Sequence, residues 1–209
     1  MILSKKELKF YISADRIISG KSPIGSFKER LRNIIRPDYI SLYLKSMRYV
    51  AYYNNVNKKI GLKIFYHKYM FNKLGVKLGF SIGYNSFGYG LLIPHYGTIV
   101  INGNTRAGNY CVLHTSTCIG GSGKVIGNAL YLSSGSFIMG SDLKLGDSIS
   151  VATNSLVNKS FSESNLLLTG SPVIIKKTSL PAWYNTERDK DQYMPKIEAI
   201  EKLRLSLNL

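Results

Sequence analysis

The stretch that decides the fold is residues 107–127, which read AGNYCVLHTSTCIGGSGKVIG. A unit led by an apolar residue recurs here every six residues, starting at Ala107, Leu113 and Ile119. The recurrence continues in both directions, with small shifts, through Phe87, Ile93, Ile99, Ile126, Leu132, Ile138, Leu145, Val151 and Val157. An internal repeat of this kind constrains a fold more strongly than local propensity does.

The six-residue period has a physical explanation. Each unit is one short strand and one corner of a triangular coil, with the aliphatic residue pointing inward and a small residue at the corner. Three units close a coil, and stacked coils pair their strands in parallel. An α/β fold would need helical crossovers, and no such segment stands between Phe80 and Pro172. An antiparallel sandwich of short strands fits the strict spacing poorly. The sequence therefore predicts a mainly β protein, a parallel β-helix over residues 80–175.

The segments on either side of the repeat have helical patterns. We expect residues 1–79 to form a basic α-helical region, and residues 176–209 to form a loop and a C-terminal helix. Ser4 and Glu7 form a capping-box pattern that starts the first helix. Further helices are expected after Ser26, from about Tyr39, from Ile60 to near Gly75, and from about Pro195.

Positive charge is concentrated in the N-terminal region. The chain of 209 residues has a net charge of +16, and residues 1–79 hold 17 of its 28 Lys and Arg but only 4 of its 12 Asp and Glu. Such a surface attracts an acidic glycan or an anionic membrane, although a merely solvated basic surface is an equal alternative. No motif that reads nucleic acid is present, so no nucleic-acid partner is expected.

Other sequence features narrow the class of protein. Cys111 and Cys118 stand alone, so neither a disulfide framework nor a metal site is expected. The sequence has no secretory signal pattern and no long apolar span. We therefore expect a cytoplasmic protein that meets a membrane, if at all, at the inner face.

Three motifs within the repeat resemble one known family. Residues 90–102 read GLLIPHYGTIVIN, residues 119–124 read IGGSGK and residues 170–172 read GSP. They are similar to hexapeptide-repeat acetyltransferases of the serine acetyltransferase type. Residues 8–17, LKFYISADRI, and 80–90, FSIGYNSFGYG, resemble the branch of that family found in bacterial polysaccharide biosynthesis. The resemblance implies a left-handed β-helix, acetyl-CoA as co-substrate and a homotrimer with its sites between subunits.

The resemblance also implies a catalytic base. His95 occupies the family's histidine position, and a neutral imidazole can take the proton of an attacking hydroxyl. His114 lies at a related position one coil later, where serine acetyltransferases often have Gln. It either assists catalysis or is a wall residue, and the sequence leaves both open. For CoA, the resemblance points to backbone amides near Gly121, Gly123, Ser134 and Thr153, and to the cations Lys159, Lys176 and Lys177, which could equally be solvated surface residues.

Three departures from serine acetyltransferases bear on the acceptor. Pro94 stands where those enzymes have an Asp before the histidine, and no Arg-His pair follows Lys124. Residues 80–85 offer no carboxylate to orient His95, which leaves Ser81, Asn85 or a backbone carbonyl. We therefore expect a sugar hydroxyl of a surface polysaccharide or its precursor as acceptor. A serine O-acetyltransferase of cysteine biosynthesis and a non-catalytic scaffold that binds polyanions are the alternatives.

Overall fold

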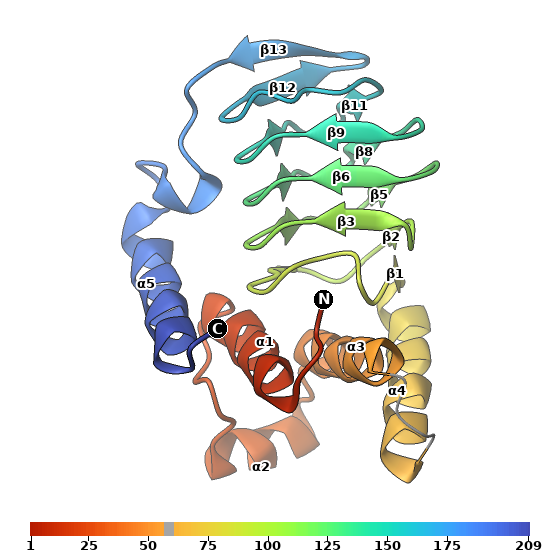
Figure 1. The fold of residues 1–209 in the computed structure, drawn as a ribbon, viewed down its shortest axis with the longest axis vertical. Helices are drawn as coiled ribbons and strands as arrows, with labels where there is room; N and C mark the ends of the chain where they lie inside the picture. The colour runs from red at the N-terminus through yellow and green to blue at the C-terminus, as the bar shows by residue number, and fades with distance from the viewer. Residues whose placement is uncertain (57–60) are drawn as a thin grey trace.

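The repeat region folds as a parallel β-solenoid of about five turns, which confirms the predicted fold class (Figure 1). The computed structural model describes residues 1–56 and 61–209, apart from the side chain of Arg30. Within this part of the chain, the strands form three sheets in the orders β1-β2-β5-β8-β11, β13-β12-β10-β7-β4 and β3-β6-β9. The strands are β1 (Phe80–Ile82), β2 (Ile99–Ile101), β3 (Thr105–Ala107), β4 (Val112–Leu113), β5 (Thr117–Ile119), β6 (Lys124–Ile126), β7 (Tyr131–Leu132), β8 (Phe137–Ile138), β9 (Leu143–Leu145), β10 (Ser150–Val151), β11 (Leu156–Val157), β12 (Leu167–Gly170) and β13 (Val173–Lys177).

The core of the solenoid consists of stacked aliphatic columns. Register pairs Ile101 with Ile119 and, one coil later, Ile119 with Ile138. A second column joins Leu113 and Leu132, and the described members of both columns are buried. From Ala107 to Val157, each leading residue of the six-residue repeat packs on the leading residue one coil away. The predicted leader Ile99 instead pairs with Thr117, and Ile101 takes its place in the column. Stacking of this kind buries apolar surface without crossover helices. The pair β12–β13 is antiparallel and closes the last coil.

Helices cover the first coil and one side of the solenoid (Figure 1). The capping box at Ser4 starts α1 (Lys5–Ile18), as the sequence predicted. The remaining helical elements are α2 (Phe27–Ile35), α3 (Tyr39–Asn55), α4 (Leu62–Leu78), the 3-10 helix η1 (Trp183–Asn185) and α5 (Lys190–Ser206). No described helix is both long and apolar enough to cross a bilayer.

Two predicted helix boundaries were wrong. The helix expected to end near Gly75 continues to Leu78, and its expected start at Ile60 lies outside the described residues. Gly75 serves close packing, because a Cβ there would stand 2.9 Å from the backbone oxygen of Phe80. The last helix begins at Lys190 and contains Pro195, at which it was expected to begin. Its first turns are held by edge-to-face packing of Tyr193 on Trp183, with ring centroids 4.8 Å apart.

Candidate active site

His95 lies on an exposed corner of the first coil, and the backbone is anchored on both sides of it. Before the histidine, Leu92 donates its N–H to the Cys111 carbonyl at 2.9 Å. After it, the Gly97 N–H bonds the Leu78 carbonyl at the end of α4 at 3.0 Å. Gly97 has φ +136°, and a Cβ there would lie 3.2 Å from the Thr115 side chain. The corner that carries His95 therefore requires glycine at this position.

A buried ion pair from the helical region fixes the segment that precedes this corner. The Nε atom of Arg48 in α3 lies 2.8 Å from Oδ2 of Asp15 in α1, and both side chains are almost completely buried. Arg48 also donates to the carbonyls of Phe87 and Gly88, at 2.8 and 2.6 Å. Asp15 accepts the N–H of Leu91 at 3.0 Å, four residues before His95. The chain segment that leads to the histidine is thus fixed by charges from two helices.

His114 lies one coil further along, directly after β4. Its backbone N–H bonds the Leu132 carbonyl at 3.0 Å, and its ring is tilted against Tyr131 with centroids 5.0 Å apart. Burial lowers the pKa of His114, and the charge of the neighbouring His95 lowers it further. Its Nε2 atom is buried and has no hydrogen-bond partner among the described residues. His114 is therefore a neutral imidazole near His95, with one ring nitrogen available.

Uncharged side chains continue this corner into the later coils. The Thr115 carbonyl accepts the Gly135 N–H at 3.1 Å, and the Ser134 carbonyl accepts the Asn154 N–H at 3.2 Å. Ser134 and Thr153 therefore stack with Thr115 at the corner that follows β4, β7 and β10, one residue beyond the position of His114. The structure brings four of the predicted site residues, His95, His114, Ser134 and Thr153, to the same corner of successive coils.

Other predicted CoA contacts lie on different corners. Gly121 and Gly123 follow β5, at the next corner of the coil, and a Cβ on Gly121 would stand 2.1 Å from the Gly140 oxygen one coil later. Lys159 follows β11 at this second corner, with its ammonium 5.5 Å from the centroid of the Phe161 ring. Lys176 and Lys177 end β13, where Lys177 pairs with Leu167 at the end of β12 that is remote from the Thr153 corner.

Lys124 has a role that the sequence analysis missed. Its side chain is 1% exposed, and its ammonium donates to the carbonyls of Ser122 and Gly140. The lysine of the IGGSGK motif therefore fastens the turn at Gly121 and Gly123 to the next coil. A lysine after a glycine-rich turn was the available signal, but the sequence alone does not show that the side chain turns inward.

The residues considered for orienting His95 have other partners or positions. Asn85 exchanges two side-chain hydrogen bonds with Asn55 of α3, at 2.8 and 3.1 Å. Ser81 lies on an exposed position of β1 opposite Val100. Within residues 1–56 and 61–209, no cluster of three or more His, Cys, Asp or Glu is placed to hold a metal ion. His95 itself is exposed, and a cavity of about 730 Å³ lies elsewhere, among the helices.

Comparisons with known proteins agree on the fold. No protein-family model and no curated protein matches the chain. Among solved structures, serine acetyltransferase of Neisseria gonorrhoeae in complex with serine aligns with TM-score 0.56 and 15% identity, over 83% of this chain and 71% of that one. A serine acetyltransferase in complex with CoA gives 0.56 and 16%, over 80% and 67%, and the soybean apoenzyme gives 0.54 and 12%, over 81% and 69%. At this low identity, the structural alignments show a shared fold and nothing more.

Proposed function

We propose that this chain is an O-acetyltransferase that moves an acetyl group from acetyl-CoA to a sugar hydroxyl, with His95 as general base. The observation that carries the proposal is this shared corner, at which an anchored, exposed His95 stands beside a neutral His114 and near uncharged hydroxyl groups. The likeness in fold to serine acetyltransferases, one of them in complex with CoA, supports the choice of donor.

The chemistry follows from a neutral imidazole beside an activated thioester. His95 accepts the proton of the acceptor hydroxyl while its oxygen attacks the thioester carbonyl. The tetrahedral intermediate collapses, the carbon–sulfur bond breaks, and the thiolate of CoA takes the proton from the His95 imidazolium. No acyl-enzyme is needed, because the thioester is already activated. The fixed backbone around His95 favours this reaction, since misplacement of a base reduces its catalytic effect.

His114 has the properties of an assisting group. Its lowered pKa keeps the ring neutral at physiological pH, so one ring nitrogen carries a proton and the other does not. The unpartnered Nε2 can therefore donate to the oxyanion or accept from the acceptor hydroxyl, according to the tautomer. Thr115 and Ser134 next to it supply further neutral hydrogen-bonding groups.

The proposed acceptor is an uncharged sugar hydroxyl, because the charged residues that would bind an amino acid are missing from this sequence. An amino-acid acceptor needs ion pairs, whereas Pro94 replaces the family's Asp and no Arg-His pair follows Lys124. A glycan or its precursor needs hydrogen bonds, and Thr115, Ser134 and Thr153 provide them. Serine is the second candidate, because solved structures of similar fold are serine acetyltransferases and one of them holds serine.

The donor would lie between subunits of a homotrimer. Gly121, Gly123 and Lys159 share a corner one strand away from the histidine corner, so a single subunit presents them on a separate edge. A trimer would set this edge of one copy against the His95 corner of its neighbour. Lys176 and Lys177 on the terminal strand would remain available to the phosphates of CoA.

Acetyl transfer should depend on His95 far more than on His114. With acetyl-CoA and a panel of neutral and acidic oligosaccharides, His95→Ala should lower the turnover by about 10²–10⁴-fold, the usual contribution of a general base. His114→Gln keeps a neutral hydrogen-bonding group and should lose about tenfold or less. Release of the CoA thiol measures the rate, and Lys144→Gln, an exposed change on β9, is the matched control.

Two results would contradict the proposal in distinguishable ways. Transfer to L-serine as efficient as transfer to any glycan would exclude the sugar acceptor and leave the acetyltransferase intact. Absence of CoA binding by calorimetry would exclude the enzyme and favour the scaffold alternative.

A further inference from the structure

Helix α2 turns its apolar face outward. Phe27, Leu31, Ile34 and Ile35 are spaced as one face of a helix, yet their exposed fractions range from 49% to 89%. Ile24, just before the helix, is 79% exposed. No side chain described on α2 is buried. In a globular protein the apolar face of an amphipathic helix normally packs on the core, so this orientation calls for an explanation.

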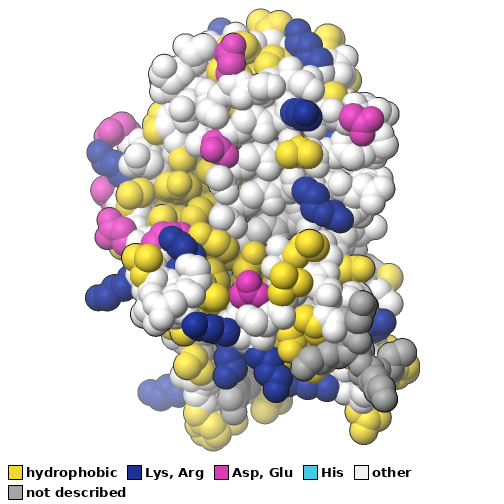
Figure 2. All heavy atoms as spheres, in the orientation of Figure 1, with side chains coloured by type: hydrophobic (Ala, Val, Ile, Leu, Met, Phe, Trp, Pro, Cys, Tyr) yellow, Lys and Arg dark blue, Asp and Glu magenta, His cyan; other side chains and the backbone are white. Residues whose placement is uncertain are grey.

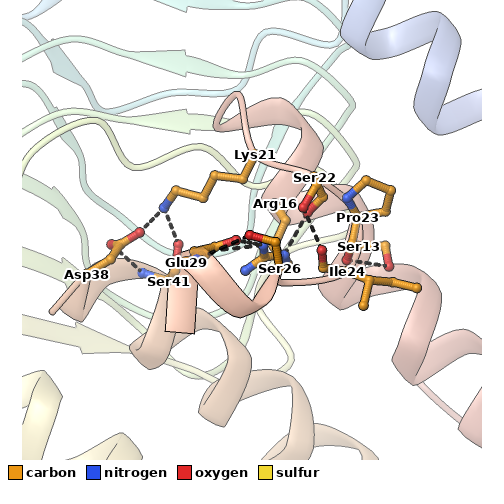
Figure 3. A network of polar contacts seen from close by, with 10 residues as sticks. All are labelled: Ser13, Arg16, Lys21, Ser22, Pro23, Ile24, Ser26, Glu29, Asp38 and Ser41. Atoms are coloured by element: carbon orange, nitrogen blue, oxygen red, sulfur yellow. Dashed lines mark hydrogen bonds and ion pairs between the residues drawn. The ribbon is translucent and has the colours of Figure 1, made fainter. Parts of the chain in front are cut away.

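The polar face of α2 holds the helix in this orientation (Figure 3). The Nη2 atom of Arg16 in α1 donates to both carboxylate oxygens of Glu29, at 2.7 and 3.0 Å. Arg16 also donates to the Ser22 carbonyl at 2.9 Å, and Lys21 bonds Asp38 at the start of α3. The cavity of about 730 Å³ adjoins this network, so α2 is attached by polar contacts rather than by core packing. These contacts fix which face of α2 meets the solvent.

Helix α4 repeats the pattern at the same end of the molecule. Leu62, Phe65, Tyr66 and Tyr69 follow one helical face and are each more than half exposed. Figure 1 places the beginning of α4 and the whole of α2 at the end opposite β13. Figure 2 shows hydrophobic side chains protruding at this end, beneath a row of Lys and Arg. We call these two apolar faces together the helical tip.

The charges around the helical tip identify its partner. Lys28, Arg32 and Arg36 border the α2 face and are exposed. Helix α4 contributes Lys63 and Lys68 in its first two turns and contains no acidic residue. Apolar side chains interleaved with cations suit the surface of an anionic membrane, where negatively charged headgroups cover an apolar acyl-chain layer. A second copy of this chain would bring two regions of net charge +13 together, and charged residues are depleted from the cores of protein interfaces.

We propose that the helical tip docks on an anionic membrane surface, with α2 and the start of α4 inserted at the headgroup level. The β-helix then projects away from the lipid. The coil that carries His95 is the one nearest the helices, so its corner stands on the membrane side of the solenoid (Figure 1). The proposal rests on the exposed faces and charges of the helical region and does not depend on any catalytic activity.

Vesicle sedimentation with the full chain tests the proposal. The protein should bind vesicles of phosphatidylcholine mixed with phosphatidylglycerol at least tenfold more strongly than vesicles of phosphatidylcholine alone, and raised salt should weaken binding. The double change Phe27→Ser and Ile34→Ser should reduce binding about tenfold or more. Lys28→Gln with Arg32→Gln should reduce it by about fivefold per charge.

The control is a double change at apolar residues of the β-helix that are also more than half exposed, Val125→Ser and Ile174→Ser, which should leave binding unchanged. Equal binding to neutral and anionic vesicles, or equal loss in the tip and control variants, would overturn the proposal. So would sedimentation equilibrium showing self-association that the Phe27→Ser and Ile34→Ser variant abolishes, because the tip would then bind a second copy.

Discussion

The β-helix and the N-terminal helices are stabilised in different ways. In the β-helix, Ile119 packs between Ile101 and Ile138, and the same arrangement recurs from coil to coil. In the helices, single contacts without repetition decide the packing, such as the ion pair of Asp15 with Arg48. The β-helix is almost neutral, whereas residues 1–79 carry a net charge of +13.

This difference separates two tasks within one chain. Repeated coils supply a rigid wall on which His95 and His114 keep their places. The helices contribute the ion pair that fixes residues 87–91, ahead of His95, and they form the exposed helical tip. The contact between the two regions is therefore where single substitutions should have their largest effect on folding.

The largest expected effect on stability is at Arg48. Arg48→Met leaves the Asp15 carboxylate and the carbonyls of Phe87 and Gly88 buried without their charged donor. We expect the free energy of unfolding to fall by about 3–5 kcal/mol, as measured by urea denaturation followed by circular dichroism.

Arg36→Met is the matched control, since Arg36 is exposed at the end of α2 and its loss should change stability by less than about 0.5 kcal/mol. If both variants lose the same amount, the ion pair does not join the helices to the β-helix.

The β-helix could be predicted because each six-residue unit shows which residue points into the core. The repeat and the capping box at Ser4 are both patterns of residues close together in the sequence, so they can be recognised without knowledge of tertiary contacts. The pair of Asp15 and Arg48 was not predicted, because 33 residues separate its members and neither belongs to a motif. Gly75 was misread as a helix end, because its role in close packing against Phe80 depends on tertiary structure.

The sequence predicted some positions of the candidate site and missed others, again because some of them depend on tertiary contacts. The resemblance named His95 and His114, and the structure places them at the same corner of successive coils as Ser134 and Thr153. It places Gly121 and Lys159 on another corner, because residues one repeat unit apart lie on successive corners of the coil. The inward turn of Lys124 and the buried Nε2 of His114 depend on neighbouring coils, which the sequence of one coil does not reveal.

A smaller effect should appear in the helices on acidification. His67 of α4 is buried and stacked on Tyr49, with centroids 3.9 Å apart. Burial, together with Lys45 and Lys63, lowers its pKa from 6.5 to about 4. The folded state therefore takes up this proton later than the unfolded chain does, so stability is lost as the pH falls from about 6.5 to about 4. The loss from this group is at most about 3 kcal/mol.

His67→Phe keeps an aromatic ring on Tyr49 and removes the titration. Urea denaturation across this pH range should show a smaller loss of stability for the variant than for the native chain. Parallel curves for the two proteins would mean that the acid sensitivity of the helical region has another source.

The smallest expected effect on stability is at the helical tip. Leu31→Ser removes an apolar side chain that is 49% exposed and lies on the outward face of α2, so the free energy of unfolding should change by no more than about 0.5 kcal/mol. Leu132→Ala, within a buried column of the β-helix, should cost about 2–5 kcal/mol. Urea denaturation of both variants measures the contrast. A loss at Leu31 as large as that at Leu132 would mean that the α2 face packs on protein in solution. The apolar side chains of the helical tip would then be buried, as those of the β-helix core are.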